Sequence, residues 1–188
     1  MTATETAFVS CSDERSRKAR FAVRIVALGD SLTAGLRTWL EIAYPSTWTP
    51  YTKFLEELTQ EHLLGLGLDM SVEILNKGVC GDLTSDMLNR FSRDVVKQKP
   101  DYVIILGGTN DIGWNLHPSH IFHTLKTLYD VAESKRIEPV ACTVPSILGF
   151  DDLIPPRLHL NNLIQREAEA RQIAFVDARA SFLLNCFV

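Results

Sequence analysis

The chain has 188 residues, of which 46% are hydrophobic and 22% are charged, and its formal net charge at pH 7 is −4. This length and composition are typical of one globular domain with a sizeable core. The negative charge argues against a nucleic-acid partner, because binding to phosphates needs clustered lysines and arginines. The one basic cluster, residues 15–20, lies in a polar leader over residues 1–20 that we expect to be disordered.

Cysteine usage and hydropathy indicate the compartment. No two of the four cysteines form a CxxC pair, so neither a metal site nor a redox motif is expected, and a disulfide scaffold is implausible at this size. The four are Cys11, Cys80, Cys142 and Cys186. The leader lacks the apolar segment of a secretory signal, and no apolar run approaches the ~18 residues that span a bilayer. We therefore expect a cytoplasmic protein with reduced thiols and no membrane span.

Short apolar runs alternate with amphipathic segments along the rest of the chain. The runs predict strands over residues 21–28, 71–75, 102–106, 139–144 and 173–176. The amphipathic segments predict helices starting near residues 50 and 84 and helices over 118–135 and 157–172. This alternation predicts an α/β fold, a three-layer α/β/α flavodoxin-like sandwich with a parallel five-stranded sheet.

Local signals locate several of the helix starts and inward faces. Thr49 resembles an N-cap, with Pro50 at the first helical position, and Thr84 opens the next helix. The residues expected to face inward are Met87, Leu88, Phe91, Ile121, Leu125 and Leu128. The loop over residues 36–48 carries three aromatic side chains, which could cover a pocket or pack the loop onto the body.

Three polar motifs each follow a predicted strand. They are Gly-Asp-Ser-Leu-Thr-Ala-Gly at 29–35, Asn-Lys-Gly-Val-Cys-Gly-Asp at 76–82 and Gly-Gly-Thr-Asn-Asp at 107–111. In a parallel sheet, the loops at the carboxyl ends of the strands converge on one edge. That convergence suits acyl transfer, which needs a nucleophile and hydrogen-bond donors aimed at one developing oxyanion.

From residue 23 to about residue 177, the three motifs in this order resemble the GDSL, or SGNH, hydrolase family of esterases and lipases. The resemblance implies that Ser31 is the nucleophile, and that the backbone N–H of Gly81 and the side-chain amide of Asn110 form the oxyanion hole together with the Ser31 N–H. It also implies a small-molecule ester substrate, and we expect no cofactor and no metal. Residues 21–188 would form this domain.

The chemistry of these positions agrees with the implied roles. A serine at a strand-to-helix turn presents its hydroxyl beside a helix N-terminus. Glycine at position 81 lets the backbone approach a substrate carbonyl closely, and Asn110 brings a neutral donor. Turn or capping roles are the alternatives for all three residues. For Asp30 and Asp111 we expect capping or loop bracing rather than contact with substrate.

A serine hydroxyl needs a base to accept its proton. The resemblance implies a histidine three residues after an aspartate, on a loop that follows the fifth strand. None of the five histidines has an acidic residue three positions before it, and residues 178–188 contain no histidine. We therefore expect a C-terminally truncated domain without the Asp-x-x-His block and the final family helix. His159 lies before the fifth strand, early in a predicted helix, so we expect a surface or packing role for it.

Two alternatives to an active esterase stay open. One is a catalytically silent, truncated protein of the same fold that lacks the histidine and aspartate of the triad. The other is a flavodoxin-like nucleotide or flavin binder, which Asp30 disfavours because its charge would repel a phosphate.

The three-residue spacing of His117, His120 and His123 resembles metal ligands. We expect no metal there, because Pro118 starts the helix and leaves His117 outside it.

Overall fold

The computed structural model describes residues 21–36, 48–146 and 151–179. The predictions for the leader, for most of the aromatic loop at 36–48 and for Cys11 and Cys186 lie outside the described residues. Of the two cysteines inside them, Cys80 is exposed, Cys142 is buried, and both are free thiols.

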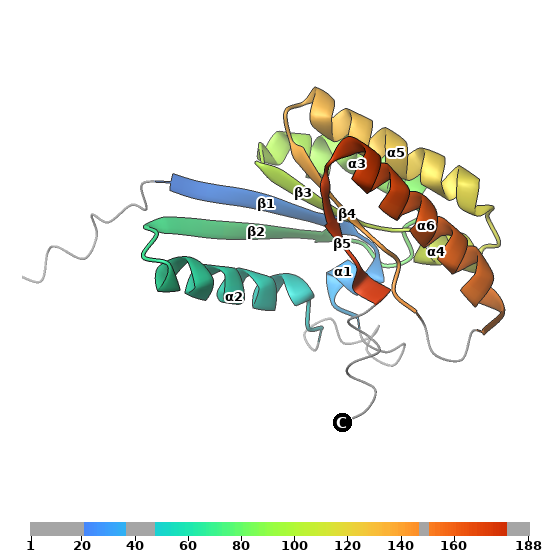
Figure 1. Ribbon diagram of the computed structural model, residues 1–188, viewed down its shortest axis with the longest axis horizontal. Coiled ribbons are helices and arrows are strands. Elements are labelled where there is room, and N and C mark those ends of the chain that lie inside the picture. The colour runs from blue at the N-terminus through green and yellow to red at the C-terminus, as the bar shows by residue number, and fades with distance from the viewer. Residues whose placement is uncertain (1–20, 37–47, 147–150, 180–188) are drawn as a thin grey trace, which may run out of the picture.

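Five parallel strands form one sheet in the order β2-β1-β3-β4-β5 (Figure 1). The strands are β1 (Phe21–Gly29), β2 (Met70–Gly78), β3 (Tyr102–Leu106), β4 (Glu138–Cys142) and β5 (Ala174–Val176). Each was predicted within three residues at either end. The α/β prediction with a parallel five-stranded sheet is therefore confirmed.

Six α-helices and two 3₁₀ turns connect the strands in the described residues. The α-helices are α1 (Ser31–Ala34), α2 (Tyr51–Gly65), α3 (Thr84–Asp94), α4 (Thr109–Gly113), α5 (Pro118–Ser134) and α6 (Ile154–Arg171), and the 3₁₀ turns are η3 (Val96–Gln98) and η4 (Asp151–Leu153). The sequence did not predict α1 and α4, because a helix of four or five residues is too short to show an apolar period.

The starts of two helices differ from the prediction. The N-cap of α2 is Pro50 in extended backbone conformation, with φ of −66° and ψ of 136°, one residue after the predicted N-cap Thr49. Helix α6 begins at Ile154, three residues before the predicted start, and has prolines in its first turn. Proline is tolerated there because the first N–H groups of a helix have no intrahelical acceptor.

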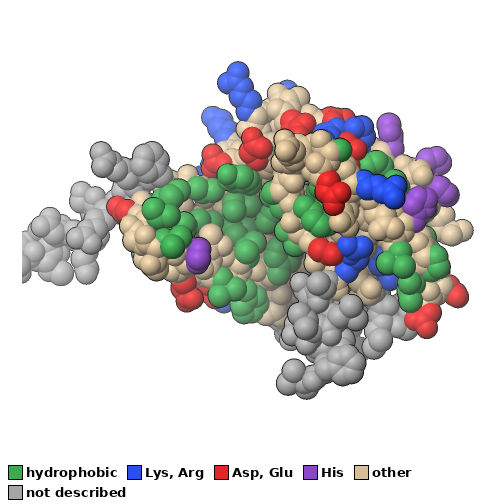
Figure 2. Space-filling view, viewed as in Figure 1, with side chains coloured by type: hydrophobic (Ala, Val, Ile, Leu, Met, Phe, Trp, Pro, Cys, Tyr) green, Lys and Arg blue, Asp and Glu red, His purple; other side chains and the backbone are tan. Residues whose placement is uncertain are grey.

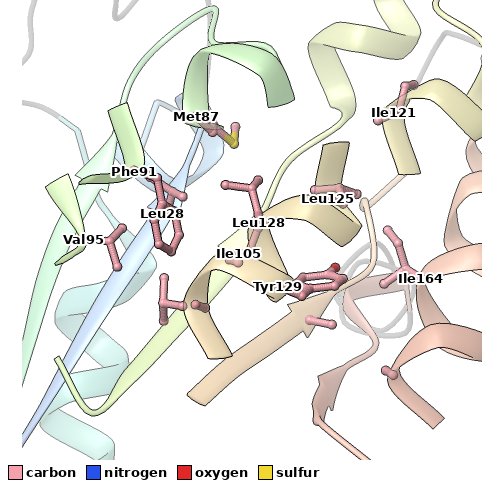
Figure 3. Packing of buried hydrophobic residues seen from close by; sticks show 14 of the residues in the cluster. Leu28, Met87, Phe91, Val95, Ile105, Ile121, Leu125, Leu128, Tyr129 and Ile164 are labelled. Carbon is pink, nitrogen blue, oxygen red and sulfur yellow. The ribbon is translucent and has the colours of Figure 1, made fainter. Parts of the chain in front are cut away.

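The hydrophobic core lies on the side of the sheet that α3, α5 and α6 cover. Side chains from β1, β3 and these three helices meet there (Figure 3). Of the predicted inward residues, Met87, Phe91, Ile121, Leu125 and Leu128 are buried, and Leu88 is partly buried against the core. This core holds the strands from one side and leaves their carboxyl ends available for loops.

The opposite side, where α2 runs along β2, is less covered. On β3, Val103 and Ile105 are fully buried, whereas Tyr102, the first residue of this strand, is 40% exposed. Hydrophobic side chains gather on this side of the molecule in Figure 2, and the exposed ones include Phe54, Leu58 and Val176. Among the described residues, the sheet therefore has one tightly packed face and one less covered, apolar face.

Candidate active site

Strand register brings the three polar motifs to the same edge of the sheet. Gly29 at the end of β1 is aligned with Gly78 at the end of β2 and with Leu106 at the end of β3. The loops that follow these strands are also joined directly, since the Val79 N–H donates to the Gly29 carbonyl at 3.0 Å. Ser31, Gly81 and Asn110 follow their strand ends by two, three and four residues respectively, so the predicted site residues lie on three adjacent loops.

Ser31 is the first residue of α1, which is separated from the end of β1 only by Asp30 (Figure 1). It is half-buried, and the residue that caps this helix is Asp30 rather than Ser31. Close packing of the strand ends holds α1 in place: a Cβ atom on Gly78 would lie 2.1 Å from the Ala34 backbone nitrogen. The serine is thus presented on a single helical turn that rests directly on β2.

Asp30 performs the capping role that the sequence predicted for it. Its Oδ1 accepts a hydrogen bond from the Leu32 N–H at 2.9 Å, and the residue is 1% exposed. Burial raises the pKa of this carboxyl from 3.8 to about 6, and the nearby carboxylates of Asp111 and Asp82 add to the rise. The site therefore holds a carboxyl group that takes up a proton near pH 6.

Gly81 lies in the loop after β2 with φ of +84°. This left-handed conformation favours glycine, because an L side chain is strained there. The residue is exposed, and a Cβ atom at this position would meet no heavy atom of the described residues within 4 Å. The glycine is therefore required by the backbone conformation, and the space beside it is open.

Asn110 is the second residue of α4 and is half-buried. Its Nδ2 donates to the backbone carbonyl of Asp82 at 2.9 Å, so the amide is anchored to the loop that carries Gly81. An amide nitrogen carries two N–H groups. Among the described residues only one of them is bonded, so the other can donate to a second acceptor.

Asp111 braces two of the loops, as the sequence predicted. Its carboxylate accepts from the Thr84 hydroxyl at 2.7 Å and from the Thr84 N–H at 3.1 Å. Burial raises the pKa of Asp111, and the hydrogen bonds from Thr84 oppose the rise. This link ties the start of α3 to α4, which carries Asn110.

Arg90 is a buried site residue that the sequence reasoning missed. From α3, its Nε donates to Asp82 Oδ2 at 2.6 Å, its Nη1 to Asp94 Oδ2 at 3.0 Å and its Nη2 to the Gly29 carbonyl at 3.0 Å. A signal was present: Arg90 lies between Met87 and Phe91 on the buried face of its helix. A cation on an apolar face indicates a buried ionic partner.

None of the five histidines, all within the described residues, hydrogen-bonds to Ser31 Oγ. His117 is the N-cap of α5, outside the helix as predicted, and its Nδ1 accepts from the Ser119 N–H. Its ring lies 6.1 Å from the rings of His120 and His159, measured between centroids. His159 is exposed early in α6, which agrees with the predicted surface role.

Metal ligands do not gather within residues 21–36, 48–146 and 151–179. No group of three or more His, Cys, Asp or Glu side chains there could hold a metal ion.

Residues 27–185 match the GDSL-like lipase/acylhydrolase family. The chain belongs to this family. An acetylxylan esterase of Geobacillus stearothermophilus is 27% identical to this GDSL-type chain over 176 residues, which cover 85% of the chain and 77% of the relative. The family places the chain among carboxylic ester hydrolases.

Solved structures agree with this assignment at the level of the fold. The crystal structure of Axe2, an acetylxylan esterase from Geobacillus stearothermophilus, has a TM-score of 0.71 at 24% identity, covering 85% of this chain and 78% of that one. A lipase/acylhydrolase from Enterococcus faecalis has a TM-score of 0.67 at 25% identity, covering 86% and 79%.

Another relative is described as a lipoprotein. An uncharacterized lipoprotein of Bacillus subtilis (strain 168), YqeF, is 37% identical over 89 residues, which cover 46% of this chain and 31% of the relative. In the described part of the chain, no helix has both the length and the apolar character that crossing a membrane requires.

Proposed function

We propose that this protein is a serine ester hydrolase of the GDSL type, with Ser31 as its nucleophile. The oxyanion hole would consist of the backbone N–H groups of Ser31 and Gly81 and the side-chain amide of Asn110. The observation that carries the proposal is the anchored amide: Asn110 donates one N–H to Asp82 at 2.9 Å, next to Gly81, and keeps one N–H for a substrate oxygen.

The reaction would proceed through an acyl-enzyme. Ser31 Oγ attacks the ester carbonyl carbon and loses its proton, and the carbonyl oxygen becomes an oxyanion that accepts hydrogen bonds from the three donors. The tetrahedral intermediate then expels the alcohol, which takes up a proton. Water attacks the acyl group in the same way and regenerates the Ser31 hydroxyl.

Activation of the serine requires a base, and no histidine among the described residues is hydrogen-bonded to the Ser31 hydroxyl. The five histidines are all described, and none hydrogen-bonds to Ser31. This observation favours the second candidate, a catalytically silent form that lacks the histidine and aspartate of the triad. In a serine hydrolase, loss of the base lowers kcat by a factor on the order of 10⁴–10⁶ and leaves a rate about 10³-fold above that in water.

The choice of a first substrate follows from a relative. An acetylxylan esterase matches most of the chain, so a small acetyl ester is the appropriate probe. p-Nitrophenyl acetate also has a good leaving group, which makes slow acyl transfer measurable.

The test compares the hydrolysis rate of the wild type with that of Ser31→Ala. Ser119→Ala is the matched control, because Ser119 is an exposed serine on α5. We expect only Ser31→Ala to lower the rate, and Asn110→Ala to lower kcat by about 10²–10³. Equal rates for the wild type and Ser31→Ala would refute the nucleophile assignment and support the silent form.

A further inference from the structure

The buried guanidinium of Arg90 hydrogen-bonds to residues of two motif loops and is linked to the third through Asp82. It donates to the Gly29 carbonyl, two residues before Ser31, and to the carboxylate of Asp82, the residue after Gly81. We propose that Arg90 is a positioning residue that holds the nucleophile and the oxyanion-hole donors in register. This inference rests on the proposed function.

Asp82 links Arg90 to the third motif loop, because both its side chain and its backbone carbonyl accept hydrogen bonds. Its side chain takes the Arg90 Nε–H at 2.6 Å, while its backbone carbonyl takes the Asn110 amide at 2.9 Å. A shift of Asp82 therefore moves the acceptor that orients Asn110. Through this residue, Arg90 controls Gly81 and Asn110 together.

Arg90 itself is held rigidly. Its neighbours on α3, Met87 and Phe91, are 0% and 1% exposed in the core, and Asp94 accepts its Nη1–H at 3.0 Å. The side chain of Arg90 is only 9% exposed, and those of Asp82 and Asp94 are 12% and 13% exposed. The network thus connects the core of the domain to the edge that carries Ser31.

The chemistry of arginine is required at this position. A guanidinium presents its donors in a fixed planar fork, and here three nitrogens reach three separate acceptors. A lysine offers a single ammonium nitrogen on a flexible stem, so it cannot satisfy acceptors on β1, on the Asp82 loop and on α3 in one geometry. Arg90→Lys keeps the charge and removes the fork.

The test measures Arg90→Lys and Arg90→Ala beside Arg93→Lys. Arg93 is the matched control because it lies on the same helix and also pairs with Asp94, yet its side chain is 68% exposed. We expect Arg90→Lys to lower kcat by about 10²-fold with little change in KM. Added guanidinium ion should restore part of the activity of Arg90→Ala, and Arg93→Lys should behave as the wild type.

A second readout does not depend on catalysis. We expect the NMR resonances of the Gly81 N–H and the Asn110 side-chain amide to shift in Arg90→Lys and to stay in place in Arg93→Lys. Absence of Ser31-dependent hydrolysis in the wild type would overturn the proposed function, while these resonances would still decide the role of Arg90.

Asp82→Asn provides an independent variant if both Arg90 variants fail to fold. It weakens the link to Arg90 and keeps the backbone carbonyl that accepts from Asn110, so we expect the same resonances to shift. A folded Arg90 or Asp82 variant with unchanged resonances and unchanged kcat would overturn the positioning role.

Discussion

Replacing Asp30 with asparagine should change the stability of the protein in a pH-dependent way, with the variant gaining stability relative to the wild type as the pH rises. The carboxyl is 1% exposed, and its Oδ2 has no hydrogen-bond partner among the described residues. Asparagine keeps the oxygen that accepts from the Leu32 N–H and is itself a good N-cap. The substitution therefore removes a buried charge and preserves the cap.

The magnitude follows from the pKa of Asp30. Burial raises it from 3.8 to about 6, so the folded state holds this proton more tightly than the unfolded state does. Asp30 therefore favours folding most at low pH, and this contribution is lost as the pH rises from about 4 through about 6. The full difference corresponds to about 3 kcal/mol, of which about 2 kcal/mol falls between pH 4.5 and 8.

Urea unfolding of the wild type and Asp30→Asn at several pH values from 4.5 to 8 measures this difference. The free energy of unfolding of the variant minus that of the wild type should rise by about 2 kcal/mol over this range. The two proteins share every other titrating group, so their common pH dependence cancels. A difference that stays constant across the range would refute the reasoning.

Asp94→Asn is a control, because the pKa of Asp94 is shifted in the opposite direction from that of Asp30. Hydrogen bonds from Arg93 and Arg90 hold the pKa of Asp94 down to about 2, so its carboxylate stabilises the folded state above pH 4 and loses this effect only as the pH falls through about 2. The variant should be less stable than the wild type by the same amount at every pH from 4.5 to 8.

Three further predictions concern stability, measured by urea unfolding. Asn161→Leu should cost about 2–4 kcal/mol, because it leaves the buried N–H and carbonyl of Val144 without the side chain that bonds both at 2.8 and 2.9 Å. Tyr129→Phe should be neutral or stabilise by up to about 1 kcal/mol, since the buried hydroxyl has no partner among the described residues; a clear loss of stability would contradict this. Gly78→Ala should cost at least about 2 kcal/mol, because its Cβ would lie 2.1 Å from the backbone of α1. Gly113→Ala meets no atom within 4 Å and should cost nothing, so equal effects of the two glycine substitutions would argue against this packing.

The sequence by itself determined the sheet, most of the helices and the three motif loops. Short apolar runs and the helical period of 3.6 residues are local properties, so each strand was predicted within three residues at either end. Because parallel strands end on one edge, the positions of Ser31, Gly81 and Asn110 after their strands also predicted that their loops would be adjacent. The capping and bracing roles of Asp30 and Asp111 followed from the same placement.

The tertiary structure decided what holds those loops in register. Arg90 and Gly29 are 61 positions apart, and Asn110 and Asp82 are 28 apart, so no local pattern relates either pair. The location of the histidines relative to Ser31 likewise depends on how α5 and α6 pack, not on their spacing along the chain. Such contacts form only when the sheet and its helices assemble, since a hydrogen bond between distant residues leaves no periodic trace in the sequence.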